Sequence, residues 1–321
     1  MGKFDGALFF SDYDDTLYNT EHTVSPENRA AIRYFIANGG RFSIATGRAH
    51  RTFTPQIARE HLEFNAPVVL SNGAAIYDYP RETYLVRTHL CNGTPDRLQA
   101  LCRDFPDLAF EAYHGEDLYV HNPNVVTMKH LERVNVPYLS CPISQMPTPW
   151  NKVIMEQDEG YLQRVRDYIL QRWPEDYEVI FSNRYLLELT DKGSDKGQMV
   201  ARVAELLDIS PEKVYCIGDN QNDIPMLARS AIPFAPANCA AEVKEWGARV
   251  LCHCNDGVIG DIVEILTSKN AKGPSRDWMK IAKSSEARSK IRQWFKKEKK
   301  EENIANGRAA FEAELKHAGI P

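Results

Sequence analysis

The sequence lacks any apolar run that approaches the roughly 20 residues of a membrane-spanning helix. Its opening residues reach acidic side chains too early for the long apolar segment of a signal peptide. Intrinsic disorder is excluded as well, because 43% of the 321 residues are hydrophobic and 26% are charged. These absences favour a globular, cytoplasmic protein of about two domains, at roughly 150 residues each, with no membrane partner.

Cysteine pairs with the spacing of a zinc site are also lacking. The chain has seven cysteines, and no two of them form a Cys-x-x-Cys pair. The single cluster is Cys252-His253-Cys254, whose spacing does not match that of usual zinc ligands. We therefore expect reduced thiols that are buried or half-buried and structural.

Charge is unevenly distributed along the chain, although the net value is only −5. Residues 268–321 contain 14 basic and 7 acidic residues, which leaves 25 basic and 37 acidic residues in the rest. An acidic body of net charge −12 is thus joined to a basic tail of net charge +7. Basic segments can bind phosphate backbones, so nucleic acid is a candidate partner of the tail alone.

Buried strands and amphipathic segments alternate along the first part of the chain. Residues 7–10, 41–45 and 67–70 are apolar runs that end in polar residues, which is typical of parallel strands covered on both faces. Between the first two runs, Ser25 as a cap and Pro26 in the first turn predict the start of a helix. This alternation predicts an α/β fold with a doubly wound parallel sheet.

The pattern changes after about residue 83. Short runs of alternating apolar and polar residues surround one amphipathic segment there, and the buried-strand pattern returns at residues 214–217. We therefore predict an α+β domain inserted into a Rossmann-like core. The predicted parts are a core of residues 1–83 plus 184–267, an insert of residues 84–183 and a basic helical tail of residues 268–321.

Four polar clusters follow predicted strands or the insert. They are residues 12–17 (Asp-Tyr-Asp-Asp-Thr-Leu), residues 46–48 (Thr-Gly-Arg), residues 190–197 around Lys196, and residues 218–223 (Gly-Asp-Asn-Gln-Asn-Asp). In an open parallel sheet, ligands bind beyond the carboxyl ends of the strands. The clusters are therefore expected to meet in one site.

The residue types in these clusters suit phosphoryl transfer. Two pairs of carboxylates concentrate negative charge, and a small number of hard oxygen ligands favours Mg²⁺. A hydroxyl, backbone N–H groups and a lysine ammonium can bind phosphoryl oxygens. One carboxylate can attack phosphorus to form an aspartyl-phosphate, while a second one protonates the leaving group and then deprotonates water.

In order and spacing, the four clusters resemble the haloacid dehalogenase (HAD) superfamily of phosphohydrolases. The long insertion between Arg48 and Lys196, with Ser71-Asn72-Gly73-Ala74 and Gly-Asp-x-x-Asn-Asp, resembles the Cof-like (HAD-IIB) branch over residues 1 to about 267. The sequence departs from the pattern at Asp15, where many members have glycine, and in Pro236-Ala237-Asn238-Cys239, where the branch usually has Gly-Asn-Ala.

This resemblance implies a role for each matching residue. Asp12 is expected to be the nucleophile and Asp14 the general acid and base. Mg²⁺ is expected on the carboxylates of Asp12 and Asp219 and on the backbone carbonyl of Asp14. Asp223 is expected to orient the metal's waters or the lysine of the site. The residues expected to hold the phosphoryl group are Thr46, Gly47, Lys196 and Asn222.

Several neighbouring residues allow two interpretations. Arg48 is equally suited to a structural salt bridge and to a substrate contact, and Asn72 is either a turn residue or a phosphate ligand. Histidines in the insert, at positions 114, 121 and 130, are as compatible with solvation as with function. The insert itself is expected to act as a cap that excludes water and selects the substrate.

The end of the chain resembles a different family. Residues 260–268, 280–284 and 290–297 resemble the end of the TGS domain and the following helical region of the RelA/SpoT alarmone enzymes. The resemblance does not extend to the hydrolase and synthetase domains, so alarmone chemistry is not implied. The tail is then a fusion passenger, an RNA- or ribosome-binding appendage, or a dimerisation or docking helix.

Together these patterns predict an enzyme, a Mg²⁺-dependent HAD-type phosphoric monoester hydrolase. Its substrate is expected to be a small phosphorylated metabolite of the sugar-phosphate type. One alternative is a phosphomutase-like enzyme that returns the phosphoryl group to a sugar. The other is a non-enzymatic RNA-binding protein that acts through its basic tail and keeps the body as a scaffold. The sequence predicts no particular oligomeric state.

Overall fold

The computed structural model describes residues 2–270. The predicted tail of residues 268–321, including most of its resemblance to the alarmone enzymes, therefore lies outside the described residues from position 271 onward. Within the described part of the chain, no helix is both long and apolar enough to span a lipid bilayer.

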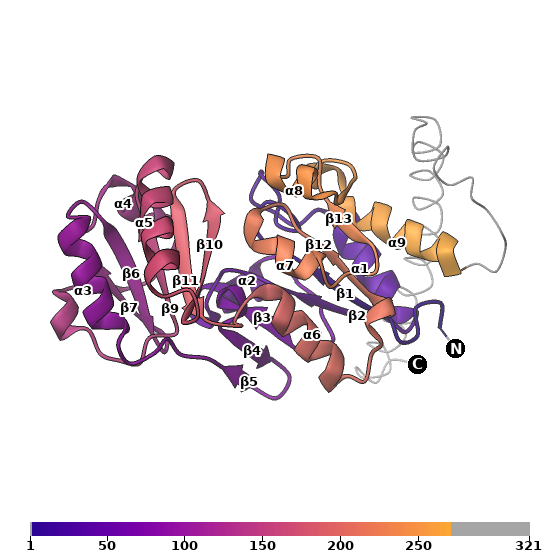
Figure 1. The fold of residues 1–321 in the computed structure, drawn as a ribbon. Helices are drawn as coiled ribbons and strands as arrows, with labels where there is room; N and C mark the ends of the chain where they lie inside the picture. The colour runs from indigo at the N-terminus through magenta and orange to yellow at the C-terminus, as the bar shows by residue number, and fades with distance from the viewer. Residues whose placement is uncertain (1, 271–321) are drawn as a thin grey trace. The chain divides into compact units, whose positions relative to one another are not determined.

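A parallel five-stranded sheet forms the centre of the core (Figure 1). Its strand order is β14-β13-β12-β1-β2, and every pairing in it is parallel. The strands are β1 (Leu8–Ser11), β2 (Arg41–Ile44), β12 (Val214–Ile217), β13 (Pro233–Ala235) and β14 (Arg249–Val250). The predicted α/β fold with a doubly wound parallel sheet is confirmed.

Helices cover both faces of this sheet, which explains why all four residues of β1 are buried. Phe9 packs in one apolar cluster with Phe35 and Ile262, whereas Leu8 packs in another with Val200. The core helices are α1 (Pro26–Ala37), α2 (His50–Arg59), α6 (Lys196–Leu206), α7 (Ile224–Leu227), α8 (Ala241–Trp246) and α9 (Val258–Asn270).

The predicted start of the first helix is confirmed. Ser25 caps α1, and its side chain accepts a hydrogen bond from the backbone N–H of Asn28. Pro26 occupies the first turn, where its missing N–H costs no helical hydrogen bond. Each of the seven cysteines is buried or half-buried, as the sequence predicts.

The third predicted strand does not join the parallel sheet in the expected way. β3 (Val68–Leu70) meets β2 only through an isolated parallel bridge between Ala45 and Val69. It pairs instead with β4 (Ala75–Asp78), which pairs with β5 (Thr83–Arg87) in an antiparallel sheet. The reason is the turn after β3, where Ser71, Asn72 and Gly73 have φ values of 53°, 52° and 103° and reverse the chain.

A second large sheet lies between β5 and α6, and its six strands run in the order β10-β11-β9-β6-β7-β8. They are β6 (Ala109–His114), β7 (Asp117–His121), β8 (Tyr138–Ser140), β9 (Lys152–Glu156), β10 (Tyr177–Asn183) and β11 (Leu186–Asp191). All their pairings are antiparallel except that of β7 with β8. We refer to residues 88–191 as the insert; they begin and end a few residues after the predicted borders.

The two faces of the insert's sheet differ in character. The helices α3 (Thr94–Asp104) and α5 (Glu159–Arg172) contribute apolar side chains to a large cluster on one face, which includes Met155. The helix α4 (Val125–Val134) contributes Leu131 to a smaller cluster that includes Ile154. Because side chains alternate along a strand, Glu156 projects to the same face as Ile154. This second face leads to the site described next.

Candidate active site

The polar clusters meet at the carboxyl ends of β1 and β12. These strands are parallel neighbours in which Ser11 pairs with Ile217. Asp12 and Asp219, which follow them closely, therefore lie at the same edge of the sheet. Lys196 reaches this edge as the first residue of α6. The structure thus brings together residues that are up to 207 positions apart in the sequence.

Lys196 is the centre of a buried ionic network. Its ammonium Nζ lies 2.6 Å from Oδ1 of Asp12 and 2.6 Å from Oδ1 of Asp223. Only 1% of Lys196 is exposed, so this charge depends on its carboxylate partners rather than on water. The ammonium fixes both carboxylates at the edge of the sheet.

Asp223 also holds the loop that carries Asp219. Its second oxygen, Oδ2, accepts hydrogen bonds from the backbone N–H groups of Asp219 at 2.9 Å and Asn220 at 3.0 Å. Gly218 allows this close approach, because a Cβ atom there would lie 2.3 Å from Cγ of Asp223. Both oxygens of Asp223 are therefore committed within the protein.

Negative charge is in excess at this edge of the sheet. Carboxylate oxygens of Asp12, Asp219 and Asp223 lie within 4.8 Å of one another, against the one ammonium of Lys196. Burial and the neighbouring Asp223 raise the pKa of Asp12 to about 7, although Lys196 opposes the shift. Burial, followed by the charges of Asp12 and Asp223, raises the pKa of Asp219 well above its usual range.

Two carboxylate oxygens remain available in this cluster. Thr16 donates its hydroxyl to Oδ1 of Asp219 at 3.0 Å, and Asp12 uses Oδ1 for Lys196. The Oδ2 atoms of Asp12 and Asp219 accept no hydrogen bond from any described residue. Two hard oxygen donors, together with uncompensated negative charge, form a set that can hold a divalent cation such as Mg²⁺.

Asp14 is engaged in an ion pair. Nε of Arg48 lies 2.9 Å from Oδ2 of Asp14, and Nη2 lies 2.6 Å from Oδ1. The guanidinium also lies 5.2 Å from the centre of the Tyr13 ring. Of the two interpretations of Arg48, the structure shows the salt bridge. Asp15 is exposed and has a φ of 57°, a left-handed conformation that explains why glycine is common at this position in the family it resembles.

The four residues expected to hold a phosphoryl group are placed differently. Gly47 and Asn222 line the pocket, whereas Thr46 is fully buried and its hydroxyl oxygen accepts from the backbone N–H of Arg48 at 3.1 Å. The fourth, Lys196, is buried, pairs with Asp12 and Asp223, and is not among the residues that line the pocket. Asn222 donates its amide to Oδ1 of Asn72 at 3.0 Å, and the amide nitrogen of Asn72 is buried with no hydrogen-bond partner among the described residues.

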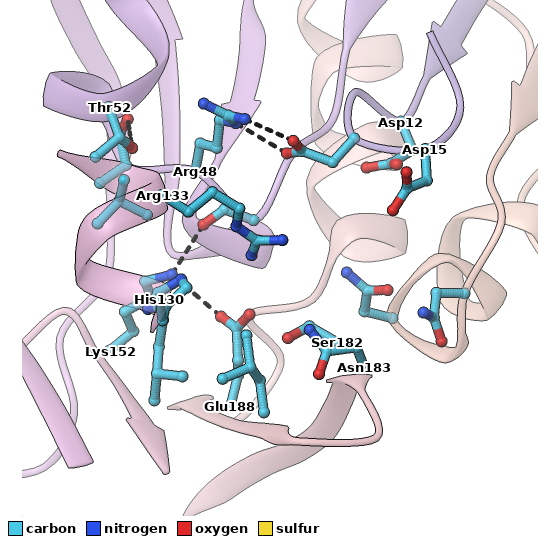
Figure 2. A pocket seen from close by; sticks show the side chains of 18 of the residues that line it. Asp12, Asp15, Arg48, Thr52, His130, Arg133, Lys152, Ser182, Asn183 and Glu188 are labelled. Atoms are coloured by element: carbon cyan, nitrogen blue, oxygen red, sulfur yellow. Dashed lines mark hydrogen bonds and ion pairs between the residues drawn. The ribbon is translucent and has the colours of Figure 1, made fainter. Parts of the chain in front are cut away.

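The pocket at this edge is lined from two sides, by the core and by the insert (Figure 2). The core contributes Asp12, Asp14, Asp15, Gly47 and Asn222, among others. The insert contributes Tyr113, His130, Arg133, Lys152, Ser182 and Glu188, among others. Lys152 connects the two sides, because its ammonium donates to the carbonyl of Gly47 at 2.8 Å and pairs with Glu188 at 3.1 Å.

The sequence pattern gives no role to the insert residues that line the pocket. It allows two interpretations of His130 and does not distinguish Arg133 or Lys152 from surface cations. One available signal was Lys152, a charged residue at the start of an otherwise apolar strand pattern. The hydroxyl of Thr16 was also missed, although it lies inside the first polar cluster.

Comparison with known proteins shows to which family the chain belongs. A family model described as haloacid dehalogenase-like hydrolase matches residues 9–262. The chain belongs to this family. The match covers the five-stranded sheet from the second residue of β1, the insert and the first five residues of α9.

Similar curated proteins are named as phosphatases. Phosphatase YwpJ of Bacillus subtilis is 24% identical to the chain over 264 residues, which are 74% of this chain and 91% of that protein. The 5-amino-6-(5-phospho-D-ribitylamino)uracil phosphatase YwtE of the same organism is 23% identical over 261 residues, which are 73% of this chain and 88% of that protein.

Solved structures show the same fold. The HAD subclass IIB sugar phosphatase BT4131 has a TM-score of 0.71 at 19% identity, over 81% of this chain and 98% of that one. A haloacid dehalogenase-like hydrolase from Bacteroides thetaiotaomicron has a TM-score of 0.70 at 22% identity, over 81% of this chain and 99% of that one.

These findings confirm the predicted haloacid dehalogenase-like hydrolase over residues 9–262, and the similar proteins named above include phosphatases. They do not support the second resemblance, that of the chain's end to the RelA/SpoT enzymes. The family model ends at residue 262, and the positions from 271 onward lie outside the described residues.

Proposed function

We propose that the chain is a Mg²⁺-dependent phosphatase that hydrolyses a small phosphorylated metabolite of the sugar-phosphate type through an aspartyl-phosphate. The observation that supports this most is the buried cluster at the end of β1 and β12. It has more carboxylates than cations, and one oxygen each of Asp12 and Asp219 accepts no hydrogen bond from a described residue.

Asp12 is the proposed nucleophile. One of its two carboxylate oxygens forms a bond to phosphorus while the bond between phosphorus and the leaving oxygen breaks. Lys196 holds Asp12 in place through Oδ1, so the carboxylate meets the phosphoryl group in a fixed orientation. The amide of Asn222 and the backbone of Gly47 are the proposed ligands of the phosphoryl oxygens, which is supported by the position of both residues in the pocket lining.

Asp14 is the proposed acid and base. It donates a proton to the leaving oxygen, and it then takes a proton from the water that attacks phosphorus and releases Asp12. In the structure, both carboxylate oxygens of Asp14 accept hydrogen bonds from Arg48. An Asp14 that exchanges a proton with the substrate or water needs a free oxygen, so we expect Arg48 to move away when the substrate binds.

The carboxylates of Asp12 and Asp219, with the backbone carbonyl of Asp14 as the resemblance implies, would hold Mg²⁺, which offsets the negative charge of the phosphoryl oxygens. We also propose that the predicted insert acts as a cap. The pocket is lined from both sides, and Lys152 links the insert to the carbonyl of Gly47. Cap residues would then contact the leaving group and select the substrate.

The function is tested by phosphate release from p-nitrophenyl phosphate, with Mg²⁺ and with EDTA. We expect release only with the metal, and we expect D12N to lower the rate by at least about a thousandfold, because the neutral amide is a poor nucleophile. D208N is a matched control, since Asp208 is exposed and does not line the pocket. A D12N rate close to that of the wild type would show that Asp12 is not the nucleophile.

Two further outcomes separate the alternatives. Isomerised sugar phosphate without free phosphate would indicate a phosphomutase-like enzyme. A protein that binds RNA and releases no phosphate from any substrate would indicate a role for the basic tail instead. The tail's contribution is tested by truncation after Thr267.

A further inference from the structure

Two fully buried carboxylates lie between the insert's sheet and the helix α4, which lines the pocket. Glu111 is on β6 and Glu156 on the neighbouring strand β9, and neither is exposed. Side-chain alternation places both on the face that packs against α4. Burying two acids costs free energy unless a cation and hydrogen-bond donors compensate them.

His130 of α4 supplies that compensation. Its Nδ1 lies 2.8 Å from Oε1 of Glu111 and 3.3 Å from Oε1 of Glu156. The hydroxyl of Tyr113 donates to the other oxygen of Glu111 at 2.7 Å. Burial lowers the pKa of His130, but the hydrogen bonds and charges of the two glutamates outweigh burial and raise it to about 9. The ring is therefore an imidazolium at neutral pH.

This imidazolium borders the pocket. His130 is one of the lining residues, and its Nδ1 is already committed to Glu111. The second ring nitrogen, Nε2, makes no hydrogen bond with any described residue. The two buried glutamates thus fix a positive charge and leave one N–H donor for a ligand.

Arg133 lies one helical turn further along α4 and lines the same pocket. Figure 2 shows its guanidinium reaching into the space between the insert and the carboxylates of the core. It forms no ion pair or hydrogen bond with the part of the chain that the structure describes. The other cations here are engaged, since Arg48 pairs with Asp14 and Lys152 pairs with Glu188.

We propose that Arg133 and His130 form a subsite for a second anionic group, an inference that rests on the proposed function. The substrate then carries a phosphate or a carboxylate besides the phosphoryl group that is removed. The reacting phosphoryl group is bound at Asp12 on the core's wall. Since α4 belongs to the opposite wall, Arg133 and His130 contact the leaving-group end of the substrate. The guanidinium of Arg133 meets the charge of Asp15 across the pocket but forms no ion pair or hydrogen bond with a described residue. Together with the imidazolium held by Glu111, it suits the planar or tetrahedral oxygens of such an anion.

Matched substrates test this subsite. Glucose 6-phosphate and 6-phosphogluconate differ by one carboxylate, and fructose 6-phosphate and fructose 1,6-bisphosphate differ by one phosphate. We expect the wild type to prefer at least one doubly anionic member by about tenfold or more in kcat/KM. We expect R133Q and H130Q to remove that preference mainly through KM, so that kcat/KM falls more for the doubly anionic member of each pair than for the singly anionic member. R133K should retain part of the preference.

K129Q is the matched control, because Lys129 is an exposed cation of the same helix that does not line the pocket. Two results would overturn the subsite: equal kcat/KM for both members of each pair, or a loss in R133Q that is the same for all substrates. If the wild type releases no phosphate at all, the proposed function fails by itself. Calorimetric titration of D12N and D12N/R133Q with each matched pair then still shows whether the subsite exists, because it measures affinity without turnover.

Discussion

Two buried clusters of metal-ligand side chains can be compared in this molecule, one in the core and one in the insert. Asp12, Asp219 and Asp223 form the core cluster, and the insert cluster consists of Glu111, His130 and Glu156. In each cluster, one ligand atom from every member lies within 4.8 Å of the others. By spacing alone, both clusters could hold a metal ion.

Their charge balance is different. The core cluster has three carboxylates against the single ammonium of Lys196, and two carboxylate oxygens accept no hydrogen bond from a described residue. The insert cluster contains its own cation, His130, and a hydroxyl donor from Tyr113. Proximity of ligands therefore does not define a metal site, because the core cluster needs a further cation and the insert cluster already contains one.

The largest expected effect comes from removing the ammonium of the core cluster. K196M leaves Asp12 and Asp223 buried without their cation, so we expect a loss of about 3–5 kcal/mol in the free energy of unfolding. Phosphate release should fall to background. Urea unfolding and the p-nitrophenyl phosphate assay measure both. K192M is the control, since Lys192 is an exposed lysine paired at the surface with Glu178 and should change stability by less than about 1 kcal/mol. Equal stability of K196M and the wild type would contradict the buried network.

Metal binding should distinguish the two clusters directly. Mg²⁺ at 100 times its Kd is expected to stabilise the wild type by about 2.7 kcal/mol, because it binds only the folded chain. We expect D219N to lose most of this gain and E111Q to keep it. The difference between the melting temperatures with and without Mg²⁺ measures this stabilisation in each variant. If E111Q loses the gain and D219N keeps it, the assignment of the two clusters is reversed.

A smaller effect separates the two glutamates of the insert. Burial raises the pKa of Glu156, and Oε1 of Glu156 lies farther from Nδ1 of His130, at 3.3 Å, than Oε1 of Glu111 does, at 2.8 Å. E156Q should therefore change the free energy of unfolding by less than about 1 kcal/mol, whereas E111Q should cost about 1–3 kcal/mol because it removes the charged partner of His130. Urea unfolding of both variants checks this order.

E111Q also tests how the free energy of unfolding depends on pH. The folded pKa of His130 is about 9 and exceeds the value of roughly 6.5 in an unfolded chain. Its contribution to stability is therefore complete below about pH 6.5 and is lost as the pH rises through 9. The charged groups facing the ring are Glu111 and Glu156, with Tyr113 bonded to the first. The stability difference between the wild type and E111Q should narrow above pH 9, and a constant difference would contradict the imidazolium.

More of the core than of the insert could be predicted from the sequence. Neighbouring parallel strands end at the same edge, so Asp12 and Asp219 could be brought together from strand patterns alone. The pairing of β3 could not, because the left-handed turn at Ser71 and Asn72 sends the chain back antiparallel. His130 and Glu156 could not be paired either, since their contact depends on how α4 packs on a sheet whose register the sequence does not specify.

Charge partners were the hardest to foresee. The ion pair of Asp14 with Arg48 joins residues 34 positions apart, and the sequence left a salt bridge and a substrate contact equally open. The available guanidinium of Arg133 could be recognised only once the partners of the other pocket cations were known.

The central claim is that Asp12 is phosphorylated during turnover. It is tested most directly by quenching the wild type with acid during the reaction with p-nitrophenyl phosphate and Mg²⁺, followed by mass spectrometry of its peptides. The account predicts one phosphoryl group on the peptide that contains Asp12, and none in D12N. Sustained phosphate release without a labelled peptide, or a label on a different residue, would contradict it.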